Sequence, residues 1–216
     1  MNLAAYFDHT ALRPDVTETT IQQLCTQAKE FGFAGVCVPP TYAALAKQLL
    51  VDTNVKVATV IGFPLGYSAT VAKVEEIKRG ITEQVDEFDV VINLAALKSG
   101  NWNQVRTDLD SMVTTCQMRA KTIKVIIETA LLTEAEIRQI CEICNELEPT
   151  FVKTSTGFNG GGATVEAVQL LRFLLKDSIK IKASGGIRDR AGAEALVAAG
   201  ADRLGASRSV SILQEH

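Results

Sequence analysis

The chain has 216 residues, of which 47% are hydrophobic and 22% charged, and its formal net charge at pH 7 is −3. This length suits one domain with a sizeable core, which we expect to span residues 1–216. A net charge this small argues against a nucleic-acid partner, and no segment approaches the roughly 20 apolar residues of a membrane span. Because the first residues show no basic region followed by a long apolar run, we expect a cytoplasmic protein.

The cysteines and histidines predict neither a disulfide framework nor a metal site. There are five cysteines, an odd number at irregular spacing, and only two histidines, His9 and His216. Cys141 and Cys144 form a CxxC pair in an amphipathic helical segment, where residues three apart share a face. We interpret them as small core residues rather than a redox or metal pair, and His9 as a packed or hydrogen-bonded side chain. No metal or cofactor is expected.

Eight short apolar runs recur along the chain, separated by longer segments with helical periodicity. The first run is weak and the others are stronger. Runs of this length indicate β-strands. They span residues 6–12, 34–38, 55–61, 88–93, 123–128, 151–154, 179–183 and 203–206.

Helix signals lie between these runs. Thr17 is placed as an N-cap before apolar residues at helical spacing, and Thr133 with Glu136 matches a capping box. Residues 191–199 end in Gly200, a natural helix stop. Further helices are predicted over residues 40–51, 68–82, 101–119 and 163–176.

This alternation of strands and helices predicts a single-domain α/β protein, a (β/α)8 TIM barrel. An open doubly wound sheet is the alternative. The barrel is favoured because no GxGxxG motif follows an early strand.

Ionisable residues interrupt several predicted strands on the face that would point into a barrel. Phe88, Val90 and Ile92 share one face of their strand, so Asp89 lies on the other. The same alternation places inside the barrel Lys124, Glu128, Lys153 and Lys182.

A buried ion-pair network is one interpretation of these residues, with Asp89 paired to Lys124 and Glu128 as a further candidate member. Three inward lysines nevertheless outnumber the inward acids, and an unpaired buried charge costs several kcal/mol or shifts its pKa.

Lys153 and Lys182 each lie at the end of a strand, before a glycine-containing loop. If the two amines meet, their repulsion is relieved when one loses its proton. Lowering a lysine pKa from ~10.4 to about 7 takes roughly 4–5 kcal/mol. A neutral lysine attacks carbonyl groups, so this pair predicts Schiff-base chemistry.

Small and glycine residues follow the last three predicted strands. The loops after the seventh and eighth strands form the common phosphate site of (β/α)8 barrels, where glycine lets backbone N–H groups approach an anion. The residues that we assign to this site are Thr156, Gly157, Gly185, Gly186, Gly205 and Ser207.

Residues 151–158 and 182–188 closely resemble the two lysine motifs of the deoxyribose-phosphate aldolase family. Supporting segments lie in the same order at residues 8–12, 36–38, 60–66, 86–93, 96–100 and 124–129. The resemblance runs nearly end to end and implies a metal-free class I aldolase on a (β/α)8 barrel. Such enzymes reversibly cleave 2-deoxy-D-ribose 5-phosphate to D-glyceraldehyde 3-phosphate and acetaldehyde.

The resemblance also implies roles for individual residues. Lys153 matches the imine-forming lysine, Lys182 the lysine that perturbs it and joins in proton transfer, and Asp89 the acid that relays protons through water. The other matches are Lys124 beside that aspartate, Asp8 and Thr10 near the substrate hydroxyls, Cys37 in the pocket lining, and Gly185, Gly186, Gly205 and Ser207 around the phosphate.

The sequence departs from the family pattern before two strands. A usual Gly-Ala is replaced by Gln84-Val85, and a usual Gly-Ala-Asp by Glu148-Pro149-Thr150. These positions concern local packing more than chemistry.

Two alternatives to this function stay open. One is a different sugar-phosphate lyase, such as a transaldolase-like or keto-sugar aldolase, with another acid/base set around the lysine. The other is a catalytically inactive barrel that binds a sugar phosphate or a protein partner. The expected partners are small sugar phosphates and aldehydes, and both a homodimer and a homotetramer fit the sequence.

Overall fold

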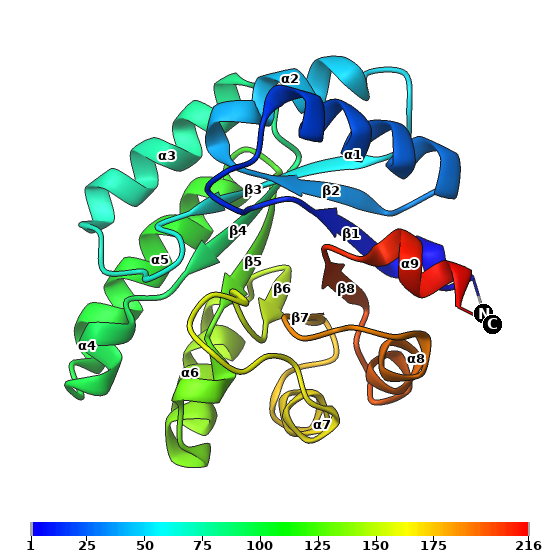
Figure 1. Cartoon of the computed structure of the whole chain (residues 1–216). Coiled ribbons are helices and arrows are strands. Elements are labelled where there is room, and N and C mark those ends of the chain that lie inside the picture. Colours follow the sequence, from blue (N-terminus) through cyan, green and yellow to red (C-terminus); the bar gives the residue numbers. More distant parts are fainter. Residues whose placement is uncertain (1, 216) are drawn as a thin grey trace.

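The computed structural model describes residues 2–215 and shows a closed barrel of eight parallel strands ringed by helices (Figure 1). Neighbouring strands pair in chain order, and β1 pairs with both β2 and β8. The predicted (β/α)8 barrel is therefore confirmed and the open sheet is excluded. The strands are β1 (Phe7–Thr10), β2 (Gly35–Val38), β3 (Lys56–Ile61), β4 (Glu87–Val91), β5 (Thr122–Ile126), β6 (Phe151–Lys153), β7 (Lys180–Ser184) and β8 (Arg203–Ala206).

Every helix predicted from the sequence is present, and the structure adds the short helices α4 and α9. These two have five and six residues, too few to show a helical period in the sequence. The α-helices are α1 (Glu18–Phe31), α2 (Ala43–Leu49), α3 (Thr70–Thr82), α4 (Leu94–Lys98), α5 (Trp102–Gln117), α6 (Glu134–Leu147), α7 (Val165–Leu174), α8 (Arg190–Ala198) and α9 (Ser209–Gln214). Three 3-10 helices are η1 (Leu3–Tyr6), η2 (Pro40–Tyr42) and η3 (Thr129–Leu131).

Side chains cap the N-termini of α1 and α6 at the residues predicted from the sequence. Thr17 caps α1 by accepting a hydrogen bond from the backbone N–H of Thr20. At α6, Thr133 and Glu136 form a complete capping box, in which each side chain accepts from the other residue's backbone N–H. The CxxC residues of α6, Cys141 and Cys144, are free thiols in the apolar core, which confirms their interpretation as packing residues.

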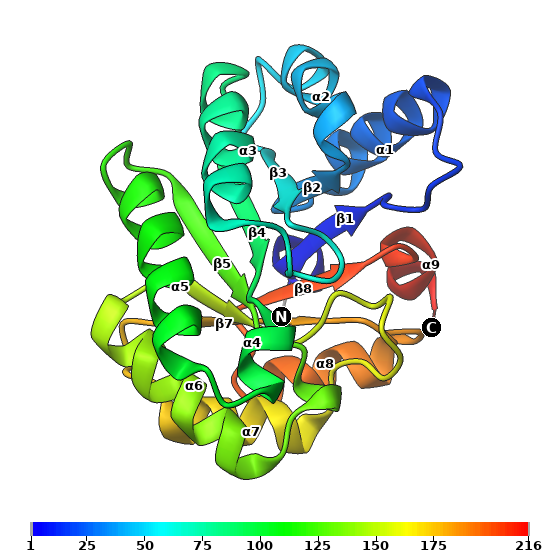
Figure 2. The same ribbon diagram turned by 90° about the vertical axis from the view of Figure 1, so that its left-hand side faces the viewer.

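The apolar core lies between the barrel and its helices, which form an outer layer in the side view of Figure 2. Phe88, Val90 and Val152 are fully buried in the same cluster as Ile77 of α3 and Leu109 of α5. Since alternate strand residues face opposite ways, the remaining positions point into the barrel, where the charged residues lie. Within residues 2–215, no helix combines the length and the apolar character needed to cross a membrane.

Candidate active site

A cluster of charged side chains fills the lower part of the barrel, centred on Asp89 of β4. The Asp89 carboxylate is fully buried and accepts from three ammonium groups. Its Oδ2 lies 2.7 Å from Lys153 Nζ and 2.8 Å from Lys182 Nζ, and its Oδ1 lies 2.9 Å from Lys124 Nζ. The strand alternation predicted that these four residues face into the barrel, and the structure brings them into contact.

Two further acids and an arginine complete the cluster. Asp8 of β1 lies 2.5 Å from Lys182 Nζ and 2.6 Å from Arg203 Nη1. Glu87 of β4 lies 2.5 Å from Lys124 Nζ and 3.4 Å from Arg203 Nη1. The expectation that the inward lysines face few acids is therefore wrong.

Glu87 and Arg203 were not identified from the sequence as members of the site, although a signal was present. Glu87 lies two residues before Asp89, and Arg203 two residues before Gly205, so each shares the inward face with a predicted site residue. Each is also the first residue of its strand.

Glu128 does not join the ionic cluster, which corrects its predicted pairing. Strand β5 ends at Ile126, and Glu128 has a left-handed backbone with φ 58° that turns the chain away from the strand direction. Its buried carboxylate instead accepts from the Thr156 N–H at 3.2 Å, from Thr156 Oγ1 at 2.5 Å and from Asn159 Nδ2 at 2.9 Å. Glu128 therefore holds the loop after β6.

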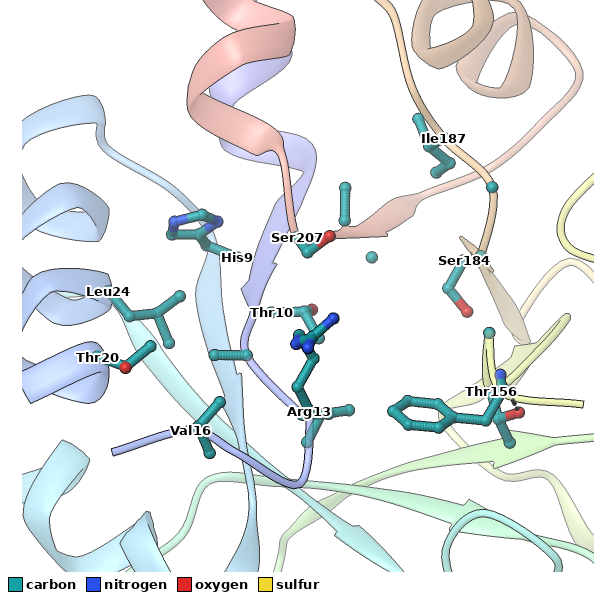
Figure 3. A pocket seen from close by; sticks show the side chains of 18 of the residues that line it. His9, Thr10, Arg13, Val16, Thr20, Leu24, Thr156, Ser184, Ile187 and Ser207 are labelled. Carbon is teal, nitrogen blue, oxygen red and sulfur yellow. Dashed lines mark hydrogen bonds between the residues drawn. The ribbon is translucent and has the colours of Figure 1, made fainter. Parts of the chain in front are cut away.

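A cavity of about 620 Å³ opens above the cluster, at the carboxyl ends of the strands. Figure 3 shows Thr10 and Ser207 on one side of it and Thr156 and Ser184 on another. The predicted site residues that line it are Thr10, Lys153, Thr156, Gly157, Gly185, Gly186, Gly205 and Ser207. Lys153 is thus the one amine of the ionic cluster that reaches this cavity.

The other predicted residues lie outside the cavity lining. Asp89, Lys124 and Lys182 are buried in the cluster beneath it. Asp8, expected near the substrate hydroxyls, is also fully buried there and bonds to Lys182 and Arg203. Cys37 is buried with Ala58 and Val60, and burial raises the pKa of its thiol to about 11.

Several lining residues were not predicted from the sequence. They come from β1 and the segment after it, from α1, from the end of β7 and from the loops after β6 and β7; the strand pattern does not define the paths of these loops. They include His9, Arg13, Leu24, Phe158, Ser184 and Ile187. His9 is buried, with Nε2 2.9 Å from Gln27 Oε1, as expected for a hydrogen-bonded histidine.

The glycines make room for the loops and for one of the lysines. Gly185 has φ 83°, and a Cβ on Gly162 would come within 2.4 Å of its carbonyl oxygen, so two loops touch through their backbones here. A Cβ on Gly205 would lie 3.1 Å from Lys182 Cε. Gly205 therefore leaves the space that the Lys182 side chain occupies.

The protonation states of the amines differ because their surroundings differ. Burial lowers the pKa of Lys153, and the Lys182 ammonium lowers it further, although Asp89 opposes both. Burial alone would also lower the pKa of Lys182, but the carboxylates of Asp8 and Asp89 outweigh it and raise that pKa. Burial is thus the main cause of the lowered Lys153 pKa, whereas the sequence interpretation assigned that effect mainly to Lys182.

The same balance keeps Asp89 ionised. Burial alone would raise its pKa, but the surrounding lysines outweigh burial and hold the pKa well below its ordinary value. A carboxylate and an amine whose pKa is lowered thus lie 2.7 Å apart at the floor of a cavity. No group of three or more His, Cys, Asp or Glu side chains suited to a metal ion occurs in residues 2–215.

Comparison with known proteins places the chain among aldolases. Residues 2–213 match the family model described as DeoC/LacD family aldolase. Deoxyribose-phosphate aldolase from Mannheimia succiniciproducens is 48% identical over 212 residues, which cover 98% of this chain and 94% of that protein. Its counterpart from Desulfitobacterium hafniense strain DCB-2 is 50% identical over 213 residues, with coverage of 99% and 98%.

Solved structures agree. QR15, described as an aldolase, superposes with a TM-score of 0.92 at 40% identity and covers 98% of this chain and 94% of that one. The tetrameric deoxyribose phosphate aldolase from Aeropyrum pernix gives 0.91 at 31% identity, with coverage of 98% and 89%. The chain therefore belongs to the DeoC/LacD family of aldolases, and it is a carbon–carbon lyase on a TIM barrel.

Proposed function

We propose that this aldolase reversibly cleaves 2-deoxy-D-ribose 5-phosphate to D-glyceraldehyde 3-phosphate and acetaldehyde through a Schiff base on Lys153. The observation that carries this proposal is the position of Lys153, an amine of lowered pKa at the floor of the cavity. The substrate is supported by relatives of 48% and 50% identity that bear the name deoxyribose-phosphate aldolase.

The reaction begins when the neutral Lys153 Nζ attacks C1 of the open-chain sugar aldehyde. Loss of water gives a protonated imine, which draws electrons from the C2–C3 bond. As that bond breaks, its electron pair forms an enamine, and the C3 hydroxyl proton passes through water to Asp89. Glyceraldehyde 3-phosphate leaves. Protonation of the enamine at C2 and hydrolysis of the imine then release acetaldehyde and restore the amine.

Lys182 and Lys124 act on this chemistry from beneath the cavity. Lys182 shares the Asp89 Oδ2 atom with Lys153, at 2.8 Å and 2.7 Å, so it favours loss of the Lys153 proton and lies within the same proton-transfer path. Lys124 holds the other Asp89 oxygen at 2.9 Å and fixes the carboxylate in place.

The loops at the cavity rim would bind the substrate phosphate, which is remote from the reacting C1 atom. We assign the phosphate to the backbone around Gly185, Gly186 and Gly205 with the Ser207 hydroxyl, and the neighbouring lining to Thr156 and Gly157. Binding energy from the phosphate positions C1 against the amine. Thr10 lines the cavity and is the candidate for a substrate hydroxyl, while Asp8 supports it from below through its backbone oxygen, which accepts from Thr10 Oγ1 at 2.9 Å.

A coupled assay for triose phosphate, with NADH oxidation as the readout, tests this function. Lys153→Ala should abolish turnover of deoxyribose 5-phosphate, whereas Lys29→Ala, an exposed lysine on α1, should retain it. Lys182→Leu should lose most activity near neutral pH because Lys153 then keeps its proton. A panel of other sugar phosphates identifies a different lyase, and a lack of turnover on all of them identifies an inactive barrel.

The setting of the enzyme stays a prediction. A homodimer or a homotetramer, a cytoplasmic location and catalysis without a metal or cofactor are all expected from the sequence. Sedimentation of the purified chain measures the first of these directly.

A further inference from the structure

We propose that Glu87 and Arg203 are positioning residues that set the pH at which the Lys153 amine becomes a neutral nucleophile. The inference rests on the proposed function, because it concerns the same amine. Each residue is the first of its strand, β4 or β8, whereas the cavity lies at the opposite, carboxyl ends. Neither residue lines the cavity, so neither is in a position to touch the substrate.

The first observation is the balance of charge in the ionic cluster. Apart from Lys153, it contains three cations and three carboxylates, namely Lys124, Lys182, Arg203, Asp8, Glu87 and Asp89. These six charges cancel. A proton on Lys153 would leave one uncompensated positive charge in a buried site, which is costly.

The second observation is how the contacts are shared. Lys182 and Arg203 each contact two carboxylates within 3.4 Å, and Lys124 contacts two within 2.9 Å. Of the three carboxylates in the cluster, Lys153 contacts Asp89 alone, and the Oδ2 atom of Asp89 also accepts from Lys182. Of the four cationic groups in the cluster, Lys153 therefore loses least when it gives up its proton.

The third observation is that Glu87 and Arg203 are screened only partly by solvent. Their side chains are 7% and 15% exposed, and they close a ring of contacts in which Arg203 joins Asp8 to Glu87 and Lys124 joins Glu87 to Asp8. A unit charge about 10 Å away, at an effective dielectric constant of about 20, shifts a titration by roughly one pH unit.

The remaining ionisable groups of β2, β3 and β7, among the residues that the structure describes, are neutral or exposed. From β2, Cys37 faces the cluster, but burial raises the pKa of its thiol to about 11 and keeps it neutral. The charged residue of β3, Lys56, is exposed. Lys180 of β7 is exposed as well, and its ammonium lies over the Phe151 ring at 5.8 Å.

The charge balance predicts shifts of opposite sign. Removing the negative charge by Glu87→Gln leaves the cluster positive, so Lys153 should lose its proton more easily. Removing the positive charge by Arg203→Met leaves it negative, so Lys153 should hold its proton to higher pH. The double variant restores the balance.

The experiment measures the rate of imine formation on Lys153 with acetaldehyde between pH 5 and 10, by cyanoborohydride trapping and peptide mass, together with the acid limb of kcat/KM. Glu87→Gln should move the acid limb down by about one pH unit and Arg203→Met up by about one, a tenfold change in rate on that limb. The double variant Glu87→Gln/Arg203→Met should keep the acid limb at the pH found for the unsubstituted protein. So should the two charge-conserving single variants, Glu87→Asp and Arg203→Lys.

A purely structural role predicts a different pattern. The proposal would be overturned if the acid limb of kcat/KM stayed at the same pH in both Glu87→Gln and Arg203→Met, or if it moved in the same direction in both. If circular dichroism shows that Arg203→Met is unfolded, the comparison of Glu87→Gln with Glu87→Asp alone decides whether the charge at this position sets the acid limb. Absence of any Lys153 adduct in the unsubstituted protein would instead overturn the proposed function itself.

Discussion

At the scale of single residues, the chemistry depends on where strand alternation directs ionisable side chains. Asp89, Lys124, Lys153 and Lys182 could be predicted because each lies in a strand with apolar neighbours on the opposite face. Glu128 could not, because its left-handed backbone ends the alternation two residues after β5. A residue-level pattern is reliable inside a strand and fails where the backbone turns.

Glu128 leads to a prediction at this scale. Its carboxylate accepts from the Thr156 N–H, from Thr156 Oγ1 and from Asn159, and Thr156 lines the cavity. In Glu128→Gln, an amide NH₂ replaces one acceptor oxygen and faces these donors, so the loop after β6 should shift. We expect kcat/KM to fall about ten- to a hundredfold, the cost of one disrupted buried hydrogen bond to a charged group.

The matched control is Glu134→Gln, an exposed residue of α6, which should keep its rate. A variant with unchanged kcat/KM would show that the loop after β6 needs no such support.

At the scale of elements, the sequence predicted the strands and the longer helices well, because both apolar period and caps were visible. Thr17 and Thr133 mark the starts of α1 and α6 as the structure has them. The short helices α4 and α9 were missed since neither spans two full turns. Glu87 was missed because the fourth strand was taken to begin one residue later, at Phe88.

Two positions at which the sequence departs from the family pattern, Gln84 and Glu148, have a left-handed backbone. Gln84, after α3, and Glu148, the C-cap of α6, have φ of 63° and 50°, the left-handed region that favours glycine. Gln84 is exposed and lies where the resembling family usually has glycine. We therefore predict that Gln84→Gly raises the free energy of unfolding by about 0.5–1 kcal/mol, after the greater entropy of the unfolded glycine chain is subtracted.

Urea unfolding measures this effect. The control is Glu142→Gly, an exposed position within α6, where the same replacement should instead destabilise by about 1 kcal/mol. Equal losses of stability at both positions would contradict the strain that we assign to Gln84.

At the scale of the whole molecule, the ionic cluster joins six of the eight strands, β1 and β4 to β8. Across these six strands the barrel interior is therefore held together by ion pairs, while the main apolar core lies between the barrel and its helices. This division could not be predicted from composition, since it depends on closure of the barrel, which brings Asp8 of β1 against Lys182 of β7 and Arg203 of β8.

The cluster predicts how stability depends on pH. The lysines hold the pKa of Asp89 well below its ordinary value of 3.8, and Asp8 is also shifted downward. Below about pH 4 the unfolded chain binds protons that the native carboxylates do not, so the free energy of unfolding falls as the pH is lowered. Above that pH the contribution of these carboxylates is fully present.

Urea unfolding of the unsubstituted protein and of Asp89→Asn at pH 7 and pH 3 checks this expectation. The variant should be less stable at pH 7 and should lose less stability on acidification. An equal loss in the two proteins would show that Asp89 contributes nothing to acid sensitivity.

The central claim, that Lys153 is the neutral amine at the cavity floor, is tested most directly by reductive trapping. The folded protein is mixed with acetaldehyde and borohydride, digested, and its peptides are weighed. We predict one ethyl group per chain on the peptide containing Lys153, and much less on that peptide in Lys182→Leu near neutral pH. An unmodified Lys153 peptide from the folded, unsubstituted protein would contradict the account.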